Sequence, residues 1–133
     1  MKALFPKGRE GILDETIKMK SGDIRAMLVK GSYIFDEADV FLSDLGEVDN
    51  GRSKTLVSKT YALGVFGAAG TSIDAIVAAV SNAVILFLYT GDDNTARLIA
   101  YIGSPANGLP CTPAAGQTLN IDWDTGPNKI FKL

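Results

Sequence analysis

Short apolar or alternating segments, separated by turn residues, make up the C-terminal half of the chain. Residues 83–89 (AVILFLY) are continuously apolar, which is typical of a central strand covered on both faces. Residues 118–123 alternate, so that Leu119, Ile121 and Trp123 share one face and polar side chains the other. The complete pattern predicts strands over 83–89, 97–102, 118–123 and 129–133, a turn over 91–94 and a loop over 103–116.

The N-terminal part combines one helical pattern with one strand pattern. Between residues 7 and 18, Ile12, Leu13 and Ile17 fall on one face of a helix, and a short helix is predicted there. Residues 23–30 (DIRAMLVK) predict a strand that ends at a Gly-Ser pair.

The middle of the chain predicts a second short helix, a loop and another strand. Asp36 can cap the short helix through its carboxylate. Asn50-Gly51 is a strong turn signal, because both residues accept positive φ, and it indicates a loop over 46–53. Residues 55–63 (TLVSKTYAL) are rich in β-branched and aromatic side chains and predict a strand.

Residues 64–80 carry the weakest pattern. The stretch 64–70 (GVFGAAG) lacks the Lys and the Ser or Thr that a phosphate-binding loop needs, so it predicts a hairpin or a bulge. In 72–80 (SIDAIVAAV), alanine favours a helix, whereas Ile, Val and the short length favour a strand. Because a strand follows directly at residue 83, a strand is the preferred interpretation.

Together these segments predict a mainly β fold: an antiparallel β-sandwich or small barrel of about six strands, with one or two short N-terminal helices. The chain of 133 residues has the usual length of one domain, so we expect a single β-rich domain over residues 1–133. Residues 1–6 form an apolar N-terminal arm. This arm either packs on its own domain or extends onto a neighbour.

Composition narrows the class of partner. The chain is 47% hydrophobic and 21% charged, as in ordinary globular proteins, and its net charge is −2. A slightly acidic surface argues against nucleic acid, which requires a basic one. The longest apolar stretch is shorter than the roughly 20 residues of a membrane helix, and the apolar run before Pro6 is too short for a signal peptide. We therefore expect a soluble protein with no membrane partner.

Residues that usually carry catalytic or metal chemistry are scarce. The chain has no His, and its one cysteine, Cys111, can form neither an intrachain disulfide nor a Cys-based metal site. The acidic pairs Asp92/Asp93 and Asp122/Asp124 lack the spacing of a calcium loop or the cleft of a hydrolase and are interpreted as solvated. The sequence predicts no enzyme, no catalytic residue, no metal site and no cofactor.

Two features are candidates for contact with a protein partner. Leu4 and Phe5 would be a liability if exposed on the arm of a lone monomer. Arg52, Lys54 and Lys59 form a small basic cluster, which is either a solubilising surface or a patch that pairs with an acidic partner. Leu4, Phe5, Arg52 and Lys54 are the predicted partner-binding set.

Several short motifs stand out along the chain. They are Phe41-Leu42-Ser43-Asp44, Tyr89-Thr90-Gly91-Asp92, Leu98-Ile99-Ala100-Tyr101-Ile102, Gly108-Leu109-Pro110, Thr112-Pro113, Trp123-Asp124, Gly126-Pro127-Asn128 and Ile130-Phe131-Lys132-Leu133. Together they resemble a widespread family of small structural proteins of tailed bacteriophages. The resemblance covers nearly the whole chain and is most specific in its C-terminal part, while the Gly- and Ala-rich stretch 64–79 departs from the family pattern.

The resemblance implies a virion component without enzymatic activity, made in the bacterial host cytoplasm. A capsid decoration, or cement, protein is the favoured role; its partners would be the major capsid protein and copies of itself, as a dimer or trimer, at the capsid surface. A neck, tail or fibre-attachment protein is the alternative. A third interpretation is a carbohydrate-binding β-sandwich for host recognition, in which Trp123 stacks on a sugar, although its alternation with Leu119 and Ile121 indicates a core position.

Overall fold

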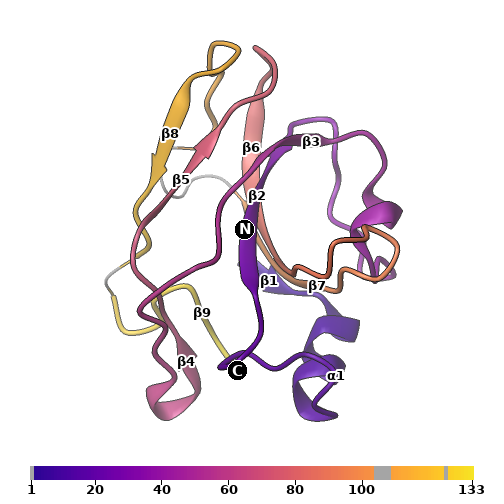
Figure 1. Cartoon of the computed structure of the whole chain (residues 1–133), viewed down its shortest axis with the longest axis vertical. Coiled ribbons are helices and arrows are strands. Elements are labelled where there is room, and N and C mark those ends of the chain that lie inside the picture. Colours follow the sequence, from indigo (N-terminus) through magenta and orange to yellow (C-terminus); the bar gives the residue numbers. More distant parts are fainter. Residues whose placement is uncertain (1, 104–108, 125) are drawn as a thin grey trace.

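The computed structural model describes residues 2–103, 109–124 and 126–133 (Figure 1). Within these ranges the chain is mainly β, its paired strands are antiparallel, and no sheet closes into a barrel. The arrangement is sandwich-like, which confirms the predicted fold class.

A five-stranded sheet forms the centre of the molecule, and each neighbouring pair in it is antiparallel. In spatial order its strands are β1 (Lys2–Leu4), β7 (Leu98–Gly103), β6 (Ser81–Leu88), β2 (Ile24–Lys30) and β3 (Asp49–Arg52). The strands predicted over 23–30, 83–89 and 97–102 are therefore confirmed, and they are the three inner strands.

Two short ribbons lie beside this sheet, on the left of Figure 1. One ribbon pairs β4 (Val65–Phe66) with β9 (Phe131–Lys132), and the other pairs β5 (Thr71–Asp74) with β8 (Thr118–Ile121). The predicted strands over 118–123 and 129–133 thus exist, in shorter form. The alternation predicted for the first of them also holds, because Ile121 and Trp123 are buried and Asn120 and Asp122 are exposed.

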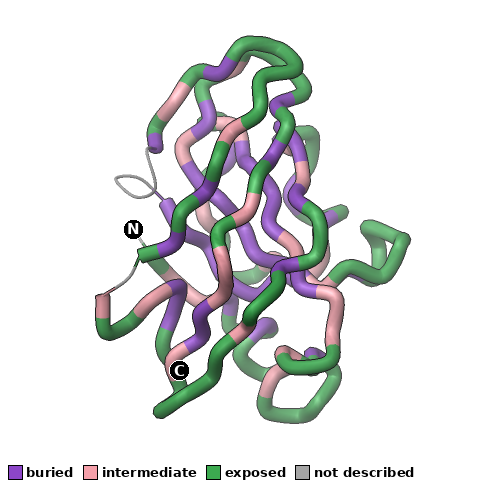
Figure 2. Tube along the Cα trace, turned by 60° about the vertical axis from the view of Figure 1, so that its left-hand side comes forward, coloured by how far each residue is buried: buried purple, intermediate pink, exposed green. Residues whose placement is uncertain are grey.

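The core lies on both faces of the central sheet, which explains the continuous apolar run in β6. Val84 and Leu86 point to the ribbons, where they join Ile73, Ile121 and Phe131 in one cluster. The alternate β6 side chains join the second cluster, under the segment that links β2 to β3; its buried members are Phe5, Met27, Val29, Tyr33, Leu42, Leu45, Val48, Ala83, Ile85, Phe87, Ala96, Leu98 and Tyr101. In Figure 2 the buried residues accordingly run through the middle strands, and exposed residues gather at the ends.

The predicted N-terminal helix exists as α1 (Pro6–Leu13), which packs against β7. Pro6 suits the first turn, where its missing N–H has no intrahelical partner to lose. The close approach of α1 to β7 requires glycine at position 8, because a Cβ there would lie 2.5 Å from the Leu98 carbonyl oxygen. The helix ends at Leu13, before the predicted limit of the helical pattern.

The second short helix was predicted at the wrong position, directly after Asp36. Asp36 caps a turn, its carboxylate accepting the Ala38 N–H at 2.9 Å, and no helix follows directly. A 3-10 helix, η1 (Leu42–Leu45), forms instead where Asp44 accepts the N–H groups of Val40 and Phe41 at 3.0 and 2.9 Å. A second 3-10 helix, η2 (Ala62–Gly64), precedes β4.

Three further predictions for the middle of the chain are wrong or only partly right. Asn50 and Gly51 make no turn, because both are buried within β3. The strand predicted over 55–63 is irregular and forms only an isolated bridge between Thr60 and Gly67. The strand predicted over 72–80 ends at Asp74.

Candidate functional site

The predicted N-terminal contacts, Leu4 and Phe5, belong to the fold of their own chain. The arm forms β1, in which Leu4 lies opposite Ala100 of β7. Phe5 is fully buried, and its ring centre lies 5.0 Å from that of Phe35. The arm therefore packs on its own domain, and the Phe5 side chain offers no surface to a partner.

The other two candidates, Arg52 and Lys54, have different surroundings. Arg52 is held within the chain, because its guanidinium pairs with Asp93 through two bonds of 2.8 Å and with Asp49 through a third of 2.8 Å. This hydrogen-bonded pairing lowers the pKa of the Asp93 carboxyl, although partial burial acts in the opposite direction. Lys54 is exposed and borders a polar hollow with Ser72, Asn120 and Asp122. The two basic residues therefore do not act as one cluster.

The most conspicuous surface feature is an apolar loop over residues 75–80, between β5 and β6. Ile76, Val77 and Val80 are 57%, 38% and 56% exposed. The loop lies at the top of Figure 1, at the opposite end of the molecule from α1. Exposed apolar side chains gathered in one place mark contact surfaces more often than single ones do.

The 75–80 loop has a fixed shape, which Asn50 imposes. The Asn50 side chain is fully buried; its Oδ1 accepts the N–H groups of Ile76 and Val77 at 3.1 and 2.9 Å, and its Nδ2 donates to Ser81 Oγ at 2.9 Å. The far end of the loop is held as well, because Gly31 N–H donates to the Val80 carbonyl at 2.8 Å. The loop therefore presents its apolar side chains without a large entropic cost of ordering on binding.

Gly51 completes this arrangement and shows why sequence reasoning missed it. Its φ is +119°, and a Cβ would lie 2.3 Å from the Asp74 carbonyl oxygen, so only glycine lets β3 approach the end of β5. Local preferences predict a turn at the Asn-Gly pair. The hydrogen-bond partners of the Asn50 side chain lie 26 to 31 residues away in the sequence, and no local pattern reveals them.

A second apolar surface lies at the other end of the molecule. Leu13 and Leu63 are 77% and 94% exposed, and Leu63 has the unusual φ of +57° for a residue with a side chain. Beside Leu63, a small apolar pocket of about 160 Å³ is lined by Ile12, Met19, Tyr61, Gly64, Val65, Phe66, Phe131 and Leu133. This end is held by the partly buried Lys59, whose Nζ donates to the Met19 and Gly22 carbonyls at 2.8 and 2.9 Å.

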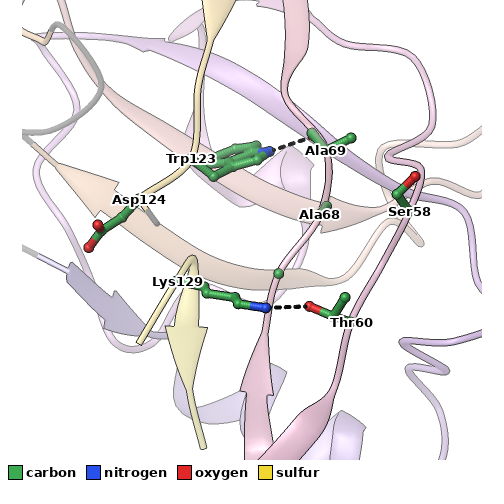
Figure 3. Close-up of a pocket in the computed structure, with 8 residues that line it drawn as sticks. Ser58, Thr60, Ala68, Ala69, Trp123, Asp124 and Lys129 are labelled. Carbon is green, nitrogen blue, oxygen red and sulfur yellow. Dashed lines mark hydrogen bonds between the residues drawn. The ribbon is translucent and has the colours of Figure 1, made fainter. Parts of the chain in front are cut away.

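A groove of about 350 Å³ lies beside Trp123 (Figure 3). The indole N–H donates to the Ala69 carbonyl at 3.1 Å, and Lys129 Nζ donates to Thr60 Oγ1 at 3.2 Å. Asp124 points away from the other labelled side chains. Because Trp123 is only 8% exposed, little of its ring can stack on a sugar, which weighs against the carbohydrate-binding interpretation.

The titratable groups do not converge on a reactive arrangement in the described parts of the chain. Burial raises the pKa of Tyr33, whose hydroxyl donates to Asp39 at 2.7 Å, and it also raises the pKa of that carboxyl. This pair braces the segment between β2 and η1. Burial likewise raises the pKa of Cys111, opposite to the change that activates a thiol.

The described residues provide neither a metal-binding cluster nor a membrane-spanning helix. Among the residues that the structure describes, no group of three or more acidic, Cys or His side chains could hold a metal ion. Within the same ranges, no helix is both long and apolar enough to cross a membrane.

Comparison with known proteins gives no match: no family model, curated protein or solved structure is similar to this chain. The predicted resemblance to phage structural proteins therefore stays untested, and only the positions of its motif residues in the fold can be described. Leu98-Ile99-Ala100-Tyr101-Ile102 is the inner strand β7, Asp44 caps η1, and Trp123 and Phe131 are buried. Most of these motif residues build the fold, and Gly108 lies outside the described residues.

Proposed function

We propose that this chain is a structural protein of a tailed-phage virion, and that it binds the lattice of the major capsid protein as a decoration protein. The observation that carries the proposal is the apolar 75–80 loop, exposed and yet held in one shape by Asn50. The motifs that resemble phage structural proteins supply the class of particle. The role is one of binding, since the most developed surface presents apolar side chains rather than reactive groups.

Docking of the 75–80 loop would supply a modest affinity for each copy. Burying a whole Val or Ile side chain contributes roughly 1.5–3 kcal/mol, and Ile76, Val77 and Val80 each have only about half of their surface left to bury. A capsid repeats the same site many times, and a subunit that touches two neighbours gains from effective concentration. Small individual contacts can then hold the shell together.

The first test is the copy number of this protein in purified particles, relative to the major capsid protein. Quantitative mass spectrometry with labelled reference peptides gives the ratio directly. A ratio near one, or a simple fraction of one, is expected for a decoration protein. A ratio of a few per cent would overturn the decoration role and favour the neck, tail or fibre-attachment alternative, and absence from particles would overturn the virion role itself.

The second test asks whether the 75–80 loop is the docking surface. A variant with Ile76→Ser, Val77→Ser and Val80→Ser is added to purified capsids that lack the protein, and bound protein is measured after sedimentation. We expect binding to fall by at least tenfold, because three apolar contacts lose their gain from burial. The matched control carries Leu13→Ser and Leu63→Ser at the opposite end and should bind normally. If the loop variant binds capsids as well as this control and the unmodified protein do, the 75–80 loop is not the docking surface.

A further inference from the structure

An asparagine followed by a glycine is especially prone to lose its side-chain amide. The chain has two such pairs, Asn50-Gly51 and Asn107-Gly108, and the second lies outside the described residues. In the reaction, the backbone nitrogen of the glycine gives up its proton and attacks Cγ of the asparagine, a C–N bond forms, and ammonia leaves. Glycine favours this ring closure, because it has no side chain and its backbone turns freely. Water then opens the succinimide at either carbonyl carbon, which gives aspartate or isoaspartate.

Asn50 and Gly51 form a bulge in β3. The pairing register with β2 shifts between Met27 and Val29, where β3 has one residue more than β2. Bulges re-aim side chains, and from this one the Asn50 side chain reaches the 75–80 loop and accepts two of its N–H groups at 3.1 and 2.9 Å. The reactive pair is thus the same pair that fixes the shape of the loop.

The electrophile of the reaction, the Asn50 amide, is closed off in the folded chain. The residue has no exposed surface, its Oδ1 is bonded to the loop, and its Nδ2 donates to Ser81 Oγ at 2.9 Å. Ring closure would turn Cγ onto the Gly51 nitrogen and release Nδ2 as ammonia, so these bonds would have to break first. Burial also keeps out the water that opens the succinimide.

The nucleophile, the Gly51 nitrogen, is engaged as well. Its N–H donates to Asp49 Oδ1 at 2.8 Å, and a carboxylate acceptor favours the protonated form of its donor. Gly51 is buried, and a Cβ at this position would lie 2.3 Å from the Asp74 carbonyl oxygen, so the backbone has little room to turn. The fold therefore holds both reacting groups.

We propose that Asn50-Gly51 is a deamidation site that the native fold keeps closed and that opening of β3 exposes. Strand β3 is an edge strand of four residues, and over the described residues β2 is its only neighbour in the central sheet. Edge elements with few partners open at a lower free energy than inner strands do. Because deamidation does not reverse, the modified fraction of the protein records how often β3 has opened.

Either product would weaken the hold on the 75–80 loop. Isoaspartate routes the backbone through Cβ and Cγ, which lengthens β3 by one backbone atom and leaves a carboxylate in a place without solvent. Aspartate keeps an acceptor for the loop but loses the Nδ2 donor to Ser81, and it buries a charge. A chain that has reacted at Asn50 would therefore refold with a loosened loop.

The first experiment measures the rate of deamidation at position 50. The unmodified protein is incubated at mildly alkaline pH, folded in buffer and unfolded in urea, and peptide mapping by liquid chromatography and mass spectrometry gives the aspartate and isoaspartate fractions over time. In urea, Asn50 should react about as fast as Asn107, which serves as the internal reference. In the folded protein, Asn50 should react at least about a hundredfold more slowly. Equal rates in buffer and in urea would overturn the protection, and an unreactive Asn50 in urea would overturn the site.

The same rates identify the opening that exposes the pair. The fraction of unfolded protein in buffer follows from a urea unfolding curve. The folded-state rate should exceed the product of this fraction and the rate in urea by about tenfold or more, because β3 opens without global unfolding. Equality of the two values would mean that only global unfolding exposes Asn50, and it would overturn the role of β3.

A second experiment asks whether deamidation loosens the loop. In an Asn107→Ser background, Asn50-Gly51 is the only Asn-Gly pair, and this protein is deamidated in urea and then refolded. The matched control is unfolded briefly and refolded at once. Hydrogen exchange of the Ile76 and Val77 amides should be at least about tenfold faster in the deamidated protein. Equal exchange in the two samples would overturn the effect on the loop.

The effect on capsid binding rests on the proposed function, whereas the deamidation site itself does not. Deamidated protein should sediment with capsids less than the matched control does. If neither sample binds capsids, the proposed function fails while the deamidation rates still decide the site. If both bind equally although the loop exchanges faster in one of them, the link between deamidation and capsid binding is overturned.

Discussion

The centre of the main sheet and the β5–β8 ribbon are both antiparallel, but they differ in how far their side chains are buried. In β6, residues 83–87 are completely buried, because protein covers both faces of the strand. In β8, buried or half-buried residues alternate with exposed ones, and among the described residues only β5 pairs with it. The difference indicates that the inner strands contribute most to stability. The ribbon adds only one face to the core, through Ile73 and Ile121, and the apolar side chains of the 75–80 loop stay exposed.

The largest expected effect contrasts one side chain from each region. Phe87→Ala removes a fully buried ring from β6 and should lower the free energy of unfolding by about 3–5 kcal/mol. Leu119→Ala, at a half-buried position of β8, should cost only about 1 kcal/mol. Urea unfolding followed by circular dichroism measures both values. Equal losses would show that the ribbon is as important to stability as the centre.

A slightly smaller effect is expected where the N-terminal arm joins the centre. Phe5→Ala should lower the free energy of unfolding by about 3 kcal/mol, because the ring is fully buried against Phe35 and the second core cluster. The neighbouring variant Leu4→Ala, at a half-buried position, should cost about half as much. Thermal unfolding of the two variants compares them; an unchanged melting temperature for Phe5→Ala would mean that the arm is dispensable.

An intermediate effect is expected where the central sheet supports the 75–80 loop. Asn50→Ala removes the acceptor of the Ile76 and Val77 N–H groups and the donor to Ser81, and should cost about 2–3 kcal/mol. Ser81→Ala removes the last of these bonds and the bond from Ser81 Oγ to the Ala79 carbonyl, but keeps both bonds to the Asn50 oxygen, and should cost about 1 kcal/mol. Hydrogen exchange of the Ile76 and Val77 amides should accelerate in Asn50→Ala and stay nearly unchanged in Ser81→Ala. Slow exchange of both amides in Asn50→Ala would refute the supporting role of Asn50.

The smallest effect concerns the ion pair between Arg52 and Asp93, and it depends on pH. Arg52→Ala removes this pair and also the bond to Asp49, and it should cost about 1 kcal/mol at pH 7, as expected for partly exposed ion pairs. Arg52 lowers the pKa of Asp93 in the folded protein, so this contribution is complete above the unfolded value of about 4 and is lost as the pH falls through the folded pKa.

Urea titrations of the unmodified protein and Arg52→Ala at pH 7 and at pH 3 measure this dependence. The difference between the two proteins should shrink at the lower pH. The exposed neighbour Lys54→Ala serves as control and should differ from the unmodified protein by less than about 0.5 kcal/mol at both pH values. A difference for Arg52→Ala that grows on acidification would contradict the assignment to Asp93.

The sequence predicted correctly those features that depend on residues close together in the chain, and it failed for features that depend on residues far apart. Strands β2, β6, β7 and β8 were predicted because their periodicity records burial on one or both faces. The 55–63 prediction failed because β-branched content favours extended backbone but cannot supply a neighbouring strand to pair with. The candidate site shows the same limit, since Phe5 was correctly identified as apolar, yet its burial against Phe35 could not be deduced from its neighbours in sequence.

The sequence by itself determined the mainly β fold, the inner strands and the alternating faces of β8, because side-chain periodicity acts between residues close in the chain. The tertiary structure alone decided which apolar residues stay exposed. Ile76, Val77 and Val80 look like a strand in the sequence. In the structure, Asn50 binds the N–H groups of Ile76 and Val77, Gly31 binds the Val80 carbonyl, and the three side chains are exposed. The one-sided pairing of β8, with β5 as its only partner among the described residues, was equally undetermined, because an edge exists only once the neighbours of every strand are fixed.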